Sequence, residues 1–161
     1  MDREELNHIK YMKMAISLAR EGMNSDAGGP FGSVIVKDGK VIGKGYNKVT
    51  SQNDPTAHAE VTAIRDACSK LNDFQLEDCI LYTSCEPCPM CLGAIYWARP
   101  KAVYYASSKE DAANIDFDDQ FIYDEIDLGY KERSITFTQM MKDTGVEVFR
   151  EWSEKEDRVK Y

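Results

Sequence analysis

The fold is decided by residues 79–106, which read CILYTSCEPCPMCLGAIYWARPKAVYYA. Residues 79–83 form a short, nearly continuous apolar run, which is typical of a strand buried on both faces. Pro87 suits the first turn of a helix, and we expect this helix to run to about Ala98. Residues 102–106 predict a second buried strand. The stretch therefore predicts a strand, a helix and a strand in succession.

A helix and a β-hairpin are expected before this stretch. Apolar residues recur at steps of three and four from Ile9 to Met23, which indicates one face of a helix. Gly22 and the polar, glycine-rich residues 24–30 are expected to end this helix. Two β-rich runs flank a tight-turn signal and predict the hairpin, namely residues 31–36, Asp38-Gly39 and residues 41–46.

A second helix is expected between the hairpin and residues 79–106. Asp54-Pro55-Thr56 supplies signals for its start. Its apolar face is formed by Val61, Ile64, Cys68 and Leu71. Strands and helices that alternate after a hairpin predict an α/β protein of three layers, α/β/α, with a central mixed β-sheet.

The length of 161 residues predicts one domain over residues 1–161. The periodicity of apolar residues weakens after residue 107. In this last part of the chain we expect a strand at residues 146–149. The final residues are largely charged but include Trp152 and Tyr161.

Composition narrows the classes of function. The chain has 20 basic and 28 acidic residues and a net charge of −8, so we expect no nucleic-acid partner. Its first residues are charged, and no apolar run approaches the roughly 20 residues that a membrane span needs, so we expect neither a signal peptide nor a membrane anchor. Five cysteines, three of them within seven positions, form a poor disulfide framework and favour a metal or redox site in the cytoplasm.

Two short motifs carry chemistry. His58 and Glu60 stand at the start of the second helix, and Cys88 and Cys91 stand at the start of the third. Cys88 and Cys91 are about one helical turn apart and share a face. One imidazole and two thiolates are a zinc ligand set that leaves a fourth position for water, as in catalytic zinc sites. Glu60 lies close enough to move a proton between that water and a substrate nitrogen.

Other interpretations of these cysteines stay open. Cys88 and Cys91 can be a redox pair or two small core residues, and Cys85 can complete a structural zinc site. An iron–sulfur run would need another cysteine where Ile95 stands. We expect Cys85 to lie beside the metal without binding it. Two cysteines are expected in the core and the second histidine in solvent, namely Cys68, Cys79 and His8.

The sequence resembles the cytidine deaminase-like superfamily of zinc aminohydrolases, and within it the small bacterial guanine deaminases. The likeness rests on GGPFG at residues 28–32, NDPTAHAE at residues 53–60, TSCEPCPMC at residues 83–91, AIYWARP at residues 94–100 and FDD at residues 117–119. The arrangement His-x-Glu with Pro-Cys-x-x-Cys is the signature of zinc deaminases. The zinc motifs specify the superfamily but not the base.

The resemblance implies hydrolysis of guanine to xanthine and ammonia in purine catabolism, with one Zn²⁺ per subunit. It implies that His58, Cys88 and Cys91 hold the metal and that Glu60 shuttles the proton. It implies Asp119 as a second carboxylate near the exocyclic amine. It implies a homodimer that exchanges its C-terminal segment, about residues 145–161. The substrate-binding residues that it implies are Phe31, Asn47, Ala59 and Tyr161.

Each implied role has a simpler alternative. Asn47 can shape the turn after the hairpin, and Phe31 can be ordinary strand packing. Asp119 can belong to a solvated acidic run, and Tyr161 to a frayed chain end. Guanosine, tRNA adenosine and cytosine are alternative substrates. A zinc-stabilised binding module without turnover is the alternative from another class of function.

Overall fold

The helices and strands follow the expected order, with additional short helices. The structure, a computed structural model, describes residues 2–161 and forms two compact units, of which the first ends at Asp119 and the second spans Gln120–Tyr161. The elements of the first unit are α1 (Arg3–Asn24), β1 (Gly32–Lys37), β2 (Lys40–Tyr46), α2 (Val49–Gln52), α3 (Ala59–Leu71), β3 (Ile80–Cys85), α4 (Pro89–Ala98), β4 (Ala102–Ser107) and α5 (Lys109–Ala113). The second unit holds α6 (Gln120–Asp127) and α7 (Lys142–Glu154). Within residues 2–161, no helix combines the length and the apolar character needed to cross a membrane.

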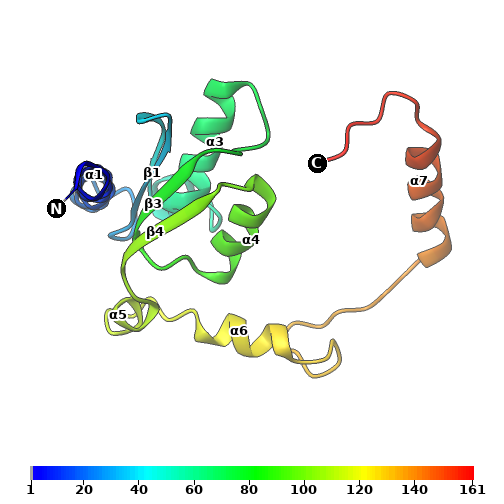
Figure 1. The fold of residues 1–161 in the computed structure, drawn as a ribbon. Coiled ribbons are helices and arrows are strands. Elements are labelled where there is room, and N and C mark those ends of the chain that lie inside the picture. The colour runs from blue at the N-terminus through cyan, green and yellow to red at the C-terminus, as the bar shows by residue number, and fades with distance from the viewer. Residues whose placement is uncertain (1) are drawn as a thin grey trace. The chain divides into compact units, whose positions relative to one another are not determined.

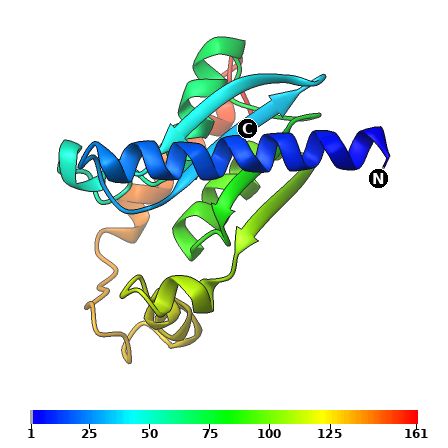
Figure 2. The same cartoon turned by 90° about the vertical axis from the view of Figure 1, so that its left-hand side faces the viewer.

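The four strands form one mixed sheet in the order β2-β1-β3-β4. β1 pairs antiparallel with both β2 and β3, and β3 pairs parallel with β4. α1 lies on one face of the sheet, and α3 and α4 lie on the other (Figures 1 and 2). The expected three-layer α/β/α architecture with a central mixed sheet is therefore confirmed.

The hairpin between β1 and β2 turns at Asp38 and Gly39. Both residues have positive φ angles, 49° and 73°. A two-residue turn with this backbone follows the right-handed twist of its flanking strands, and Asp-Gly is a favoured pair for it. The turn therefore fixes the register of the hairpin, which pairs Lys37 with Lys40.

α1 begins one residue after Asp2, whose side chain accepts a hydrogen bond of 2.8 Å from the Glu5 N–H. The helix continues through Gly22, which was expected to help end it. Gly22 is buried against the Tyr46 ring, so close that a Cβ atom there would lie 2.7 Å from that ring. The expected face was also partly wrong: Ile9 and Met23 are exposed, and the buried face consists of Tyr11, Ala15, Ala19 and Gly22.

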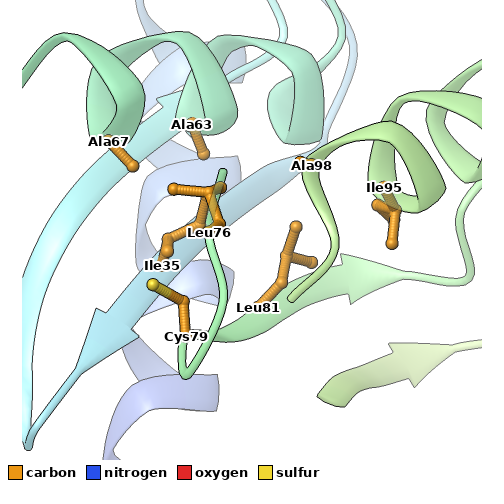
Figure 3. Packing of buried hydrophobic residues seen from close by; sticks show 8 residues of the cluster. All are labelled: Ile35, Ala63, Ala67, Leu76, Cys79, Leu81, Ile95 and Ala98. Atoms are coloured by element: carbon orange, nitrogen blue, oxygen red, sulfur yellow. The ribbon is translucent and has the colours of Figure 1, made fainter. Parts of the chain in front are cut away.

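The core of the first unit has two parts, one on each face of the sheet. β3 serves both, because successive side chains of a strand point to opposite faces. Leu81 packs with α3 and α4, and Tyr82 packs with α1. Figure 3 shows the part beneath α3 and α4, which contains Ile35, Ala63, Ala67, Leu76, Cys79, Leu81, Ile95 and Ala98. Cys79 is fully buried and Cys68 packs against this cluster, as expected of core cysteines.

Three local expectations are wrong. β4 is not a buried strand, since it forms an edge of the sheet and leaves Tyr104 and Tyr105 about half exposed. His8 does not face solvent, because its Nδ1 lies 2.7 Å from the Tyr82 hydroxyl and its ring lies 4.4 Å from that of Tyr104. Residues 146–149 are part of α7 and not a strand.

The second unit, Gln120–Tyr161, has no buried residue. Many of its large apolar side chains are exposed, including Phe137, Met140, Phe149 and Trp152. A segment of 42 residues that buries nothing lacks a hydrophobic core of its own.

Candidate metal centre

Two helices of the first unit begin at the expected metal ligands. His58 is the N-cap residue of α3 and Cys88 is the N-cap residue of α4, and neither side chain caps its own helix. Both residues have extended backbones, so their side chains are not committed to the helix that follows. Pro89 occupies the first helical position of α4, where a missing N–H costs nothing. Cys91 follows in the first turn and is fully buried.

The structure brings the three side chains together. The Cys88 and Cys91 sulfurs each lie 3.5 Å from the His58 Nδ1 atom, and the three ligand atoms lie within 4.8 Å of one another. Zinc–sulfur bonds of about 2.3 Å and zinc–nitrogen bonds of about 2.05 Å at tetrahedral angles place sulfur and nitrogen about 3.6 Å apart. The observed spacing and the donor types therefore fit one zinc ion with three protein ligands.

The two thiols differ in acidity. A hydrogen bond from Cys91, with a further contribution from His58, lowers the pKa of Cys88 to about 4. The neighbouring Cys88 sulfur, together with burial, raises the pKa of Cys91. Zinc binds cysteines as thiolates, so a divalent cation displaces any proton that the pair still carries.

Glu60 lies beside the ligands. Its side chain is buried, and burial raises the pKa of its carboxyl group. Oε1 accepts a hydrogen bond of 3.2 Å from the Thr83 hydroxyl, and Oε2 lies 3.4 Å from the Cys91 sulfur. Glu60 is not part of the ligand group, and its carboxylate lies next to that group without belonging to it.

A close approach between β2 and α3 sets the position of His58 and Glu60. A Cβ atom on Gly45 would lie 2.3 Å from the Ala59 carbonyl oxygen, and one on Gly43 would lie 2.5 Å from the Ala63 carbonyl oxygen. Only glycine lets the strand pass this near to a helix backbone. Ala59, which stands between His58 and Glu60 in the sequence, is fully buried.

Asn47 connects the end of the hairpin to residues 28–29. Its Oδ1 atom accepts hydrogen bonds from the Gly29 N–H at 3.3 Å and from the Val49 N–H at 3.1 Å. The expected alternative of a turn-shaping residue is thus part of its role. Because Oδ1 is occupied, a ligand would meet the Nδ2 group, which can only donate hydrogen bonds.

Two phenylalanines stand above Gly29. The Phe31 and Phe117 rings pack edge to face with centroids 5.0 Å apart. A Cβ atom on Gly29 would approach both rings to about 3 Å. Phe31, which directly precedes β1, therefore has an aromatic neighbour in Phe117.

Asp119 and Tyr161, the two remaining expected site residues, have different surroundings. Partial burial and the nearby Cys88 sulfur raise the pKa of Asp119, so its carboxylate lies within electrostatic reach of the metal ligands. Tyr161 belongs to the second unit and is largely exposed. Its approach to the substrate stays a prediction.

Cys85 lies at the end of β3 outside the ligand group. Its sulfur lies 3.5 Å from the Ser108 carbonyl oxygen, and burial raises the pKa of its thiol to about 11. Its sulfur is not among the three ligand atoms that lie within 4.8 Å of one another. The expectation that Cys85 does not bind the metal agrees with this geometry.

Thr83 and Phe117 were missed by the sequence reasoning. Both lie in quoted motifs, TSCEPCPMC and FDD, but neither had a role assigned. A signal for Thr83 existed, because a hydroxyl two positions after Leu81 faces the same side of the sheet. Phe117 had no comparable signal, since no regular element carries it.

Comparison with known proteins places this site in a family. Residues 6–107 match the family described as the cytidine and deoxycytidylate deaminase zinc-binding region. A guanine deaminase of Bacillus subtilis is 58% identical over 156 residues, which cover 97% of this chain and 100% of that protein. The X-ray structure of guanine deaminase from Bacillus subtilis has a TM-score of 0.93 and 56% identity, and the match covers 100% of this chain and 99% of that one.

A more distant relative shares less of the chain. A tRNA-specific adenosine deaminase of Aquifex aeolicus is 40% identical over 97 residues, which cover 60% of this chain and 64% of that protein. The expected resemblance to guanine deaminases and the expected zinc cofactor are confirmed, the latter by the ligand group His58, Cys88 and Cys91. The chain therefore belongs to the cytidine and deoxycytidylate deaminase family of zinc-dependent aminohydrolases.

Proposed function

We propose that this protein is a guanine deaminase, which hydrolyses guanine to xanthine and ammonia. One observation carries the choice of substrate. The match to the deaminase family ends at residue 107, whereas the match to the Bacillus subtilis guanine deaminase covers 156 residues and so includes nearly all of the second unit. The part of the chain outside the common zinc region is thus shared with a protein that deaminates guanine.

The reaction that we propose uses the ligand group and Glu60. Zinc held by His58, Cys88 and Cys91 would supply a hydroxide nucleophile at neutral pH, because zinc lowers the pKa of water from 15.7 to about 7. Glu60 accepts the proton from the attacking water and delivers it to the ring nitrogen beside C2 of guanine. Glu60 then takes the proton of the new C2 hydroxyl group and passes it to the exocyclic amine, the C2–N bond breaks, ammonia leaves, and the C2=O group that forms completes xanthine. Asp119 accepts a hydrogen bond from that amine and assists its protonation.

Four further residues bind the purine in this proposal. Asn47 donates a hydrogen bond through Nδ2, because its oxygen is occupied by backbone N–H groups. Phe31 stacks on the ring, with Phe117 supporting it from the side. Ala59 contributes its backbone, and Tyr161 closes the pocket.

We also propose a cytoplasmic homodimer that exchanges its C-terminal segment, about residues 145–161. A second unit without a buried residue supports this proposal, since its exposed apolar side chains need a surface to cover them. Exchange of an element between identical subunits is a low-cost route to such a surface. All five cysteines are free, as is usual in a reducing compartment. Purine catabolism is the process that guanine hydrolysis would serve.

The test is ammonia release from guanine, guanosine, adenine, cytosine, cytidine and tRNA, with Glu60→Gln as the inactive control. We expect guanine to be the preferred substrate. Glu60→Gln should retain one zinc per chain. Its activity should fall by about 10²- to 10⁴-fold, which is the usual contribution of general acid–base catalysis.

Faster turnover of tRNA or cytosine than of guanine would overturn the substrate while keeping the zinc chemistry. No turnover of any of the six by the zinc-loaded wild type would favour a binding module. Deletion of Tyr161 should lower guanine turnover at unchanged zinc content, and wild-type rates in that truncation would remove this residue from the site.

A further inference from the structure

A buried hydroxyl contacts the acid–base carboxylate from the sheet. The Thr83 side chain is almost completely buried, and its Oγ1 atom donates a hydrogen bond of 3.2 Å to Oε1 of Glu60. The two residues come from different elements, β3 and α3, and are 23 positions apart in the sequence. The bond therefore joins the sheet to the helix at the site itself.

The position of Thr83 on β3 decides where its hydroxyl points. Alternation along the strand puts Leu81 and Thr83 on the face covered by α3 and α4. Thr83 is paired with Ser33 of β1 on one side and with Tyr105 of β4 on the other. β3 is therefore an inner strand whose backbone pairs with a neighbouring strand on each side. The Thr83 hydroxyl projects from the sheet and donates to Glu60.

The two oxygens of Glu60 have different surroundings. Oε1 faces Thr83, while Oε2 faces the Cys91 sulfur at 3.4 Å. A cysteine that binds zinc is a thiolate and no longer donates a hydrogen bond. With Cys91 as a thiolate, Thr83 would be the one side chain within residues 2–161 of this structure that donates a hydrogen bond to Glu60.

We propose that Thr83 is a positioning residue that holds Oε1 of Glu60, so that Oε2 is the oxygen that exchanges the proton next to the metal. This inference rests on the proposed role of Glu60. The terminal torsion of a glutamate has broad, roughly two-fold minima, so the side chain alone does not fix the direction of its oxygens. A hydrogen bond to one oxygen fixes that torsion and leaves the other oxygen directed at the ligand group.

Three substitutions isolate the hydroxyl. Thr83→Val keeps the branched shape and removes the O–H group, Thr83→Ser keeps the O–H group and removes the methyl group, and Thr83→Ala removes both. Ser33→Ala is the matched control, because it removes a buried hydroxyl at the paired position of β1. The Ser33 hydroxyl donates to the Tyr82 carbonyl oxygen at 3.0 Å and forms no hydrogen bond with Glu60.

The measurement is kcat and KM for guanine, with kcat normalised to bound zinc. We expect Thr83→Val and Thr83→Ala to lower kcat by about 10- to 100-fold, as loss of a partner behind a metal site typically does, with KM within about threefold. Thr83→Ser and Ser33→Ala should keep kcat within about threefold of the wild type. If Thr83→Val does not fold, the ratio between Thr83→Ser and Thr83→Ala still isolates the hydroxyl.

Equal kcat per bound zinc in Thr83→Ser and Thr83→Ala would overturn the inference, as would a loss confined to KM or to zinc content. A similar drop in kcat in Ser33→Ala would also overturn it, because any buried hydroxyl of the sheet would then have the same effect. An inactive zinc-loaded wild type overturns the proposed function itself. The two failures are therefore distinguishable.

Discussion

Replacement of Gly45 by alanine should damage the metal centre from the opposite side of a helix. The new Cβ atom would lie 2.3 Å from the Ala59 carbonyl oxygen and 2.6 Å from the Ala63 nitrogen. Ordinary contact begins at 3.4 Å, so the first turn of α3 must retreat by about 1 Å. Ala59 is the residue between His58 and Glu60, and both move with it.

The size of the effect follows from that displacement. A misplacement of about 1 Å in an active site can cost about 100-fold in rate, and overpacking a core costs about 1–3 kcal/mol of stability. We therefore expect Gly45→Ala to lower guanine turnover by about 100-fold and to weaken zinc retention. Gly43→Ala is the matched control, because its Cβ atom meets the Ala63 carbonyl oxygen at 2.5 Å, one turn beyond the ligands.

The assay compares the two variants with the wild type in ammonia release, zinc content after dialysis and urea unfolding. Both should lose about 1–3 kcal/mol in the free energy of unfolding. Gly43→Ala should keep at least about ten times more activity than Gly45→Ala, because the ligands lie outside its contact. Equal activity in the two variants at equal stability would refute the reasoning that β2 sets the position of His58 and Glu60.

Three further outcomes are expected. Removal of zinc with a chelator should lower the thermal midpoint, and added Zn²⁺ should restore it, since an ion that binds only the folded chain stabilises it; an unchanged midpoint in calorimetry would show that the ion contributes nothing to the fold. Asn47→Asp keeps the oxygen acceptor for Gly29 and Val49 but loses the Nδ2 donor, so the KM for guanine should rise by about tenfold with the urea midpoint nearly unchanged. Burial raises the pKa of Tyr82 from 10.0 to about 12, so the unfolded chain loses this proton first and stability falls as the pH rises above 10; urea midpoints at pH 9 and pH 11 should show a smaller fall in Tyr82→Phe.

The zinc ligands could be predicted because spacing along the chain encodes them. Cys88 and Cys91 are three positions apart at a helix start, and His58 is two positions from Glu60 at another. Asp38-Gly39 gave the hairpin for a similar reason, because few residue pairs adopt two positive φ angles. Features that depend on a few neighbouring residues are visible in a single sequence.

Contacts between distant residues could not be predicted in this way. The partner of His8, Tyr82, is 74 positions away, and nothing near His8 in the sequence indicates this contact. The exposure of β4 depends on its place at the sheet edge, which its apolar composition does not reveal. The Glu60–Thr83 bond likewise requires the register of the sheet to be known.

The error at residues 146–149 has a different physical cause. The apolar residues Val146, Val148 and Phe149 form too short a run to separate the strand period from the helix period. In the structure Val148 and Phe149 are exposed and Val146 is half-buried, so burial on one sheet face does not distinguish them either. The structure includes them in α7, where Glu147 and Arg150 form an ion pair at helical spacing.

His58 and Cys88 open their helices without capping them, and this arrangement bears on protein engineering. Along the chain, the two positions require only an extended backbone and a helix that follows, while Gly43 and Gly45 of β2 allow the close approach of α3. A scaffold in which two helices start side by side already supplies the polarity and most of the spacing for such a trio of donors. To transfer this site to another protein, a designer would also have to place a hydroxyl on the sheet, as Thr83 is placed here, within hydrogen-bond distance of the glutamate.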